Sequence, residues 1–200
     1  MPRYVALVRG VNLGGHTVKM DRLKKLFEEL GFKNVETFIA SGNVIFETAS
    51  KSAGTLEKKI TGHLEKSLGF PALTFLRTEQ EFAAVLEHEA LEEDGWDSIY
   101  VGFLAAGPSK ESHDKLMSYS TKFDDFHVNG REVYWRCKTH MSDSPFFRVG
   151  LEKALGTKVT VRNVTTVTKI VEKHFHGKPM AATNEKGAAR KAKASGRGAK

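Results

Sequence analysis

The stretch FIASGNVIF, residues 38–46, has the pattern of a tight β-hairpin, and the stretch FHVNGREVY, residues 126–134, has the same pattern. In each, apolar residues flank a short turn that contains Gly and Asn, which readily adopt the backbone conformations that hairpin turns require. A strand and a helix precede each hairpin, and a helix and a strand follow it, over residues 3–77 and again over about 98–163. The repetition predicts two modules, each with the element order βαββαβ.

Hydrophobic spacing and end signals place the individual elements. In the first module, strands are expected at 4–8, 35–40, 44–46 and 73–76 and helices at 20–30 and 53–68. In the second, strands are expected at 99–104 and 158–162 on either side of the hairpin, with helices at 109–118 and 145–155. The Asn129-Gly130 pair predicts a type I′ turn. Thr78, with Glu81 three residues later, predicts the start of a bridging helix, and a closing helix is expected at 165–174.

The order βαββαβ is that of a ferredoxin-like plait, so the expected fold class is α+β, with two ferredoxin-like plaits packed together. The first module is expected at residues 1–78, a bridging helix and linker at 79–97, and the second module with its closing helix at 98–176. A sheet with one solvated face alternates apolar and polar residues, but strands 4–8 and 99–104 are apolar on both faces. Their open faces are therefore expected to be covered by each other or by a second copy of the chain, which leaves a homo-oligomer open.

The basic character of the chain is concentrated at its end. The net charge is +7, and residues 177–200 contribute seven Lys and Arg against one Glu, or +6, so the first 176 residues carry the remaining +1. Residues 177–200 contain no large apolar side chain after Met180, which predicts a disordered tail because the segment cannot bury enough apolar area to order itself. Cations on such a tail can bind phosphate without sequence preference: Lys186, Arg190, Lys191, Lys193, Arg197 and Lys200. The alternative is an extension that only aids solubility.

Composition excludes several classes of protein. Cys137 is the single cysteine, so an intrachain disulfide and a cysteine zinc cluster are excluded, and a reducing cytoplasm is the expected location. No apolar run approaches the 18 or so residues of a membrane span, so no membrane partner is expected. The eight histidines show no metal-ligand spacing, and no cofactor is predicted.

The best functional candidate is the glycine-rich loop RGVNLGG, residues 9–15, between the first strand and the first helix. Glycines there let backbone amides approach a ligand, and a helix N-terminus favours an anion. The loop lacks the second glycine of a dinucleotide fingerprint and the Gly-Lys-Ser/Thr of a Walker loop. The alternative is a turn that only connects two elements.

Plait topology brings a second segment to this loop. The loop after the first strand and the turn between the second and third strands emerge at one end of the sheet, so Arg9 and Asn12 are expected to lie about 10 Å from Ser41 and Asn43. One cation, two amides and a hydroxyl could there hold a carboxylate or phosphate. The alternative for the segment 41–43 is ordinary turn chemistry.

Three motifs together resemble the bacterial domain-of-unknown-function 1697 family: YVALVRGVNLGG at 4–15, SGNVIF at 41–46, and VRNVTTV at 161–167. Val164 and Thr165 depart from that family, which usually has Trp and Asn there. The resemblance implies paired ferredoxin-like plaits and no established activity, so no catalytic residue is assigned and whether the chain is an enzyme stays open. It marks as candidate ligand-binding positions Arg9, Gly10, Asn12, Gly14, Gly15, Ser41, Gly42, Asn43, Arg162 and Asn163.

These observations lead to two interpretations of function. In the first, the protein binds a small phosphate- or carboxylate-bearing ligand in a cleft between the two plaits, where Arg162 and Asn163 meet the loop of the first module. In the second, it associates with nucleic acid through the basic tail.

Overall fold

The computed structural model of the protein describes residues 1–12, 15–92 and 95–175. The first half contains β1 (Arg3–Val8), α1 (Met20–Glu29), β2 (Lys33–Phe38), β3 (Asn43–Glu47), α2 (Ala53–Leu68) and β4 (Thr74–Thr78). Its strands form one antiparallel sheet in the order β2-β3-β1-β4. All six elements of the first module are therefore present close to the expected positions.

The second half repeats this arrangement. It contains β5 (Ser98–Phe103), α4 (Lys110–Met117), β6 (Asp124–Asn129), β7 (Glu132–Cys137), α5 (Gly150–Leu155), β8 (Thr160–Asn163) and the closing helix α6 (Val164–His174). The sheet order is β6-β7-β5-β8, which corresponds strand for strand to the first sheet. The protein thus has a mixed α+β structure with two four-stranded antiparallel sheets, consistent with two plaits.

Three short segments complete the chain. The linker between the halves begins as α3 (Glu79–Ala84) and continues as the 3-10 turns η1 (Val85–Glu87) and η2 (Glu89–Leu91). Thr78 and Glu81 form the expected capping box at its start. Two further 3-10 turns, η3 (Met141–Asp143) and η4 (Pro145–Arg148), precede α5.

Two local predictions are wrong in detail. The helix expected at 145–155 is split into η4 and α5, because Gly150, the first residue of α5, has φ +70° and so cannot continue a right-handed helix from η4. The second hairpin does not have Asn129 at the centre of its turn. Asn129 instead pairs with Glu132, so the central residues are Gly130 and Arg131. Of these, only Gly130 has a positive φ, which fits a type II′ turn rather than a type I′ turn.

The apolar β1 strand explains how the sheets are arranged. Tyr4, Ala6 and Val8 face an outer core that includes residues of α1 and α2, whereas Val5 and Leu7 face the other way. The second group belongs to an inner apolar layer shared by both sheets, to which β5 contributes Val101 and Phe103. The open faces are therefore covered by each other, together with α3 and α6.

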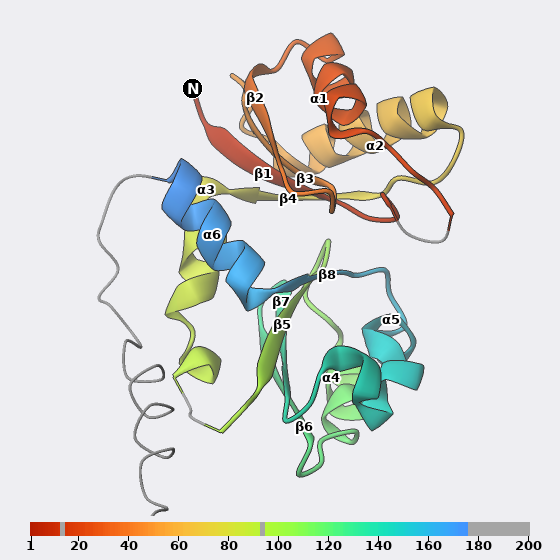
Figure 1. The fold of residues 1–200 in the computed structure, drawn as a ribbon, viewed down its shortest axis with the longest axis vertical. Helices are drawn as coiled ribbons and strands as arrows, with labels where there is room; N and C mark the ends of the chain where they lie inside the picture. The colour runs from red at the N-terminus through yellow and green to blue at the C-terminus, as the bar shows by residue number, and fades with distance from the viewer. Residues whose placement is uncertain (13–14, 93–94, 176–200) are drawn as a thin grey trace, which may run out of the picture.

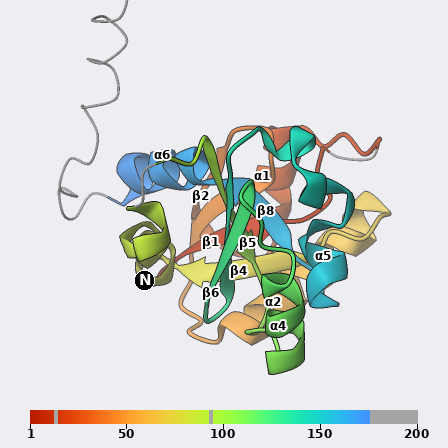
Figure 2. The same ribbon diagram turned by 90° about the horizontal axis from the view of Figure 1, so that it is seen from below.

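The figures show this layering. In Figure 1, α1 and α2 lie on the side of the first sheet away from the second, and α3 and α6 lie between the two sheets at one margin. In Figure 2, α6 lies on one side of the strands and α5 on the other. Side chains of α4 and α5, including Leu116, Leu151 and Leu155, fill a third core with Trp135.

Within the described ranges, no helix has the length and apolar character needed to cross a membrane. The predicted basic tail, residues 177–200, lies outside the described residues.

We expect Gly42→Ala to destabilise the protein far more than Gly15→Ala. Gly42 has φ +71°, and a Cβ there would lie 2.6 Å from the Val8 carbonyl oxygen. Gly15 has φ +88° but no atom within 4 Å of such a Cβ. The left-handed backbone should cost about 1 kcal/mol at both positions, and the clash should raise the cost at Gly42 to about 2–4 kcal/mol. Urea unfolding measures the difference, and equal losses would contradict the close approach.

Candidate functional site

The two halves meet at a group of charged and amide side chains that we call the junction cluster: Arg9, Asn43, Glu152, Lys158 and Arg162. Arg162 extends from β8 toward the first sheet and is only 8% exposed. Its Nε donates to Asn43 Oδ1 at 2.6 Å, and its Nη2 donates to the Val8 carbonyl at 3.3 Å. Its Nη1 donates to Thr160 Oγ1 and to the Val161 carbonyl. Arg162 therefore joins β8 to β1 and β3.

All of these acceptors are neutral. Burial removes water from the guanidinium and lowers the pKa of Arg162 to about 10. Among the described residues, no carboxylate forms an ion pair with Arg162. A buried cation is normally paired with an acid, so this arginine brings an uncompensated positive charge to the boundary between the halves.

Arg9 crosses the same boundary in the opposite direction. It follows β1 and donates from Nε and Nη2 to the two carboxylate oxygens of Glu152, at 2.6 and 3.0 Å. Glu152 lies on α5 in the second half. Both side chains are about one-third exposed. This pairing gives Arg9 a structural role, because it connects the loop after β1 to α5.

Glu152 receives further donors. The Val159 amide donates to its Oε1 at 3.2 Å, and Lys158 Nζ lies 3.5 Å from its Oε2. Although burial alone would raise the pKa of Glu152, the hydrogen bonds from Arg9 and Val159 lower it below its ordinary value. A surface depression lined by Glu152, Gly156, Thr157 and Lys158 adjoins the pair. Three cations and one carboxylate give the junction cluster a net charge of +2.

The β2–β3 turn and the loop after β1 meet as the topology predicts. Asn12 has φ +58°, and its side chain donates to the Ala40 carbonyl at 2.7 Å and accepts from the Val18 amide at 2.8 Å. Fully buried Asn43 donates to Ser41 Oγ and to the Phe38 carbonyl, while its Oδ1 accepts from Arg162. These side chains therefore hold the turn and the loop together.

The remaining predicted positions have other roles or surroundings. The Gly42 carbonyl accepts from the Val8 amide at 2.8 Å. Gly10 has φ +82° and lies close to the Pro71 carbonyl. Asn163 caps α6 by accepting from the Thr165 amide. Gly15 has open space around it, and Gly14 lies outside the described residues. The junction cluster thus brings together three of the predicted residues, Arg9, Asn43 and Arg162, and ligand binding by them stays a prediction.

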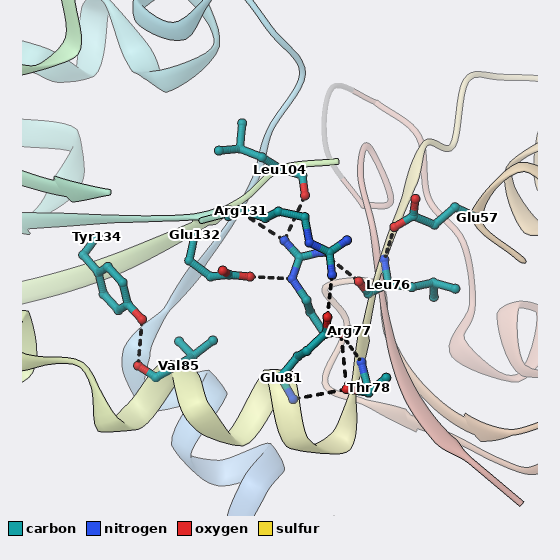
Figure 3. A network of polar contacts seen from close by, with 10 residues as sticks. All are labelled: Glu57, Leu76, Arg77, Thr78, Glu81, Val85, Leu104, Arg131, Glu132 and Tyr134. Carbon is teal, nitrogen blue, oxygen red and sulfur yellow. Dashed lines mark hydrogen bonds and ion pairs between the residues drawn. The ribbon is translucent and has the colours of Figure 1, made fainter. Parts of the chain in front are cut away.

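Sequence reasoning missed a second buried arginine, shown in Figure 3. Arg77 on β4 is fully buried, and its Nε donates to Glu132 Oε1 of β7 at 2.5 Å. Its other nitrogens donate to the carbonyls of Leu76, Leu104 and Arg131. Burial lowers the pKa of Arg77, and Glu132 opposes that effect. One signal in the sequence could have indicated this burial. Arg77 lies two positions after Phe75, so it shares the face of β4 that packs in the inner apolar layer.

Two other contacts complete this network. Arg131 Nη2 donates to Glu81 Oε1 at 2.9 Å, and the Tyr134 hydroxyl donates to the Val85 carbonyl at 3.0 Å. Glu81 also belongs to the capping box at the start of α3. The linker is therefore fastened to β7 through Tyr134 and to the hairpin turn through Arg131.

Other chemistry finds little support among the described residues. Cys137 is fully buried, and burial together with Asp124 raises its thiol pKa to about 12, so the reactive thiolate is disfavoured. Within the described ranges, no group of three or more His, Cys, Asp or Glu is arranged to hold a metal ion. What the junction cluster offers chemically is hydrogen-bond donors and positive charge, which suit an oxyanion.

Comparisons with known proteins agree with the fold. Residues 1–134 match a family model described as protein of unknown function (DUF1697). The structure is similar to that of the conserved bacterial protein SP0830 from Streptococcus pneumoniae, with a TM-score of 0.67 and 24% sequence identity over 86% of this chain and 97% of that chain. At that identity the likeness shows the fold alone. No curated protein matches the chain.

Arg77→Met should destabilise the protein strongly, whereas Arg131→Met should not. The first change leaves Glu132, whose side chain is only 16% exposed, without its partner and should cost about 3–5 kcal/mol. The second removes a partly exposed pair with Glu81 and should cost about 1 kcal/mol or less. Urea unfolding of both variants tests this. Adding Glu132→Gln to Arg77→Met should recover part of the loss, and no recovery would show that the unpaired carboxylate is not its cause.

Proposed function

Because the chain belongs to the DUF1697 family of proteins of unknown function, we propose its function from its own geometry: it binds a small phosphate- or carboxylate-bearing anion at the junction cluster, between two ferredoxin-like plaits. The observation that carries the proposal is Arg162. Its guanidinium is buried and, among the described residues, bonded only to neutral acceptors, in contrast to Arg77, which is paired with Glu132. An anion beside Arg162 supplies the counter-charge that the described residues do not.

Two neighbouring features support an anion as the ligand. Arg162 Nη2 donates to the carbonyl of Val8, the residue before Arg9. The Arg162 guanidinium therefore lies beside the backbone that carries Arg9. An arginine fork can bond an oxyanion at two points, which a single ammonium cannot do in the same geometry. The depression lined by Glu152 and Lys158 gives a small molecule a way to approach Glu152, the partner of Arg9.

The proposal concerns binding and assigns no catalytic residue. We place it in the cytoplasm, since a chain with a single cysteine suits a reducing compartment. The glycines at 10, 14, 15 and 42, with Asn12, Ser41 and Asn163, are proposed to shape the loops around the anion rather than to contribute charge.

Sulfate should stabilise the protein against urea, and Arg162→Gln should remove most of that gain. A ligand that binds the folded state alone raises the unfolding free energy in proportion to the logarithm of its concentration over Kd. Gln keeps a hydrogen-bonding side chain beside Asn43 but removes the charge. For each variant, the gain is the difference between the unfolding free energies measured with and without sulfate. A lower starting stability of a variant therefore does not affect the result.

Arg22→Met is the matched control, because Arg22 pairs with Glu29 on α1, outside the junction cluster. It should keep the full sulfate gain. Arg9→Met should lose the gain and lower stability in buffer by about 1 kcal/mol, as expected for a partly exposed pair. If Arg162→Gln and Arg9→Met both retain the wild-type gain, the junction cluster is not the anion site.

The second proposed function, association with nucleic acid, rests on the seven cations at residues 177–200. Lys186, Arg190, Lys191, Lys193, Arg197 and Lys200 are the contacts that this proposal requires, together with Lys178. These residues lie outside the described part of the chain, so the proposed association with nucleic acid is based on their charge and spacing alone.

Truncation after residue 176 should abolish any binding to nucleic acid. Binding by the full chain should weaken with salt, with a log–log slope of about −5 to −6 if as many phosphates are contacted. A fluorescence-anisotropy titration of labelled duplex DNA at several salt concentrations measures the slope. Binding that survives truncation and ignores salt would exclude the tail as its source.

A further inference from the structure

We propose that the Glu152 carboxylate already occupies an anion position at Arg9, on the α5 side of the junction cluster, and that a phosphate-bearing ligand binds by displacing it. This inference rests on the anion-binding function proposed above and adds the ligand's class and the competitor that it must displace.

The geometry around Glu152 is that of a bound oxyanion. Both of its oxygens accept from the Arg9 fork, at 2.6 and 3.0 Å. The Val159 amide and the Lys158 ammonium lie at 3.2 and 3.5 Å. A guanidinium fork, a backbone amide and an ammonium group are the donors with which proteins commonly bind phosphate. Here one side chain of the protein uses all three.

The Arg9–Glu152 pair is also exchangeable. Both side chains are about one-third exposed, and a pair with that exposure is worth on the order of 1 kcal/mol or less, about a fivefold bias. Arg77–Glu132, with a fully buried arginine, offers no such opening. Glu152 therefore lowers the apparent affinity for a ligand by a modest factor without closing the position.

Charge favours phosphate over carboxylate as the incoming group. Once Glu152 has moved, the position faces the cations Arg9 and Lys158. A carboxylate only restores the single charge that Glu152 supplied, whereas a phosphate dianion adds a second. One extra unit charge about 4 Å from a cation changes affinity by about fivefold even at the dielectric constant of water, and by more where water is excluded.

The experiment uses the full chain and compares methyl phosphate, sulfate and acetate at neutral pH and constant ionic strength. Isothermal titration calorimetry gives the affinity of each anion for the wild-type protein, for Glu152→Gln and for Glu65→Gln. The last variant removes one exposed carboxylate from α2, outside the junction cluster. Holding ionic strength constant is necessary because exposed charges are screened by salt.

Wild-type protein should bind methyl phosphate and sulfate at least about fivefold more tightly than acetate. Glu152→Gln should tighten the binding of all three by a similar factor of about five, because it removes a competitor for one position. Glu65→Gln should change nothing. In the wild-type protein, the Val159 amide should shift in the NMR spectrum on saturation with methyl phosphate, since its acceptor leaves. That measurement does not depend on whether a variant folds.

Several results would overturn the inference. If Glu152→Gln strengthens dianion binding by about the square of its effect on acetate, Glu152 acts by through-space repulsion and does not occupy the position. If the affinities or the Val159 amide do not change, nothing is displaced, although the proposed function still stands. If acetate binds as tightly as methyl phosphate, the ligand class is not phosphate, and only that part of the inference is wrong. No binding of any anion by the wild-type protein or by Glu152→Gln would remove both the inference and the proposed function.

Discussion

The inner apolar layer between the sheets is the constraint on which the rest of the structure depends. Val5 and Leu7 of β1 and Val101 and Phe103 of β5 are all fully buried, on the faces of their strands that a lone sheet would leave in water. Burying one such side chain contributes about 1.5–3 kcal/mol relative to exposing it. The two sheets therefore face each other, and α3 and α6 close the layer at one margin. Once this layer forms, a polar group buried at its rim loses water and needs a hydrogen-bond partner within the protein.

Arginines meet that demand. Arg9 and Arg77 extend from the first half to the second, and Arg162 extends from the second half to the first. A guanidinium has five donors on a long stem, so one side chain can bond several carbonyls of a neighbouring strand and still reach a side-chain acceptor. Arg77 donates to Glu132 and to three carbonyls, and the Glu132 carboxylate balances its charge. Arg162 makes as many bonds but balances no charge.

The sequence predicted what depends on local pattern and topology. The stripe Leu23, Leu26 and Phe27 on α1 is buried as its spacing requires, and strand order alone placed the loop after β1 beside the β2–β3 turn. The split of residues 145–155 was missed because the apolar pattern continues across Gly150, and the sequence does not show that this glycine has a positive φ. The second hairpin turn moved by one residue because the pairing of Asn129 with Glu132 sets its register.

The sequence predicted some residues of the candidate site but not the contacts that form between the two halves. Plait topology predicted that Arg9 and Asn43 converge, whereas Arg162 was expected to join them only on the hypothesis that the second module packs its last strand against that loop. Glu152 and Arg77 were not predicted, because their roles exist only once the two halves are docked, and no spacing within either module specifies that contact. The same holds for the charge of the site, to which Lys158 and Glu152 both contribute.

Hydrogen bonds and charge answer different questions about a buried arginine. Counting bonds makes Arg162 a structural residue, since Asn43, Thr160 and two carbonyls accept from it. The charge of Arg162 is not explained by these bonds. Neutral dipoles replace only part of the solvation that burial removes, so the pKa of Arg162 falls to about 10. A neutral amide would cost less to bury, but its two N–H donors could make at most two of these four bonds. The retained charge, beside a second arginine bonded to an exchangeable carboxylate, is what distinguishes the junction cluster from the Arg77 network and makes it the part of the interface suited to a ligand.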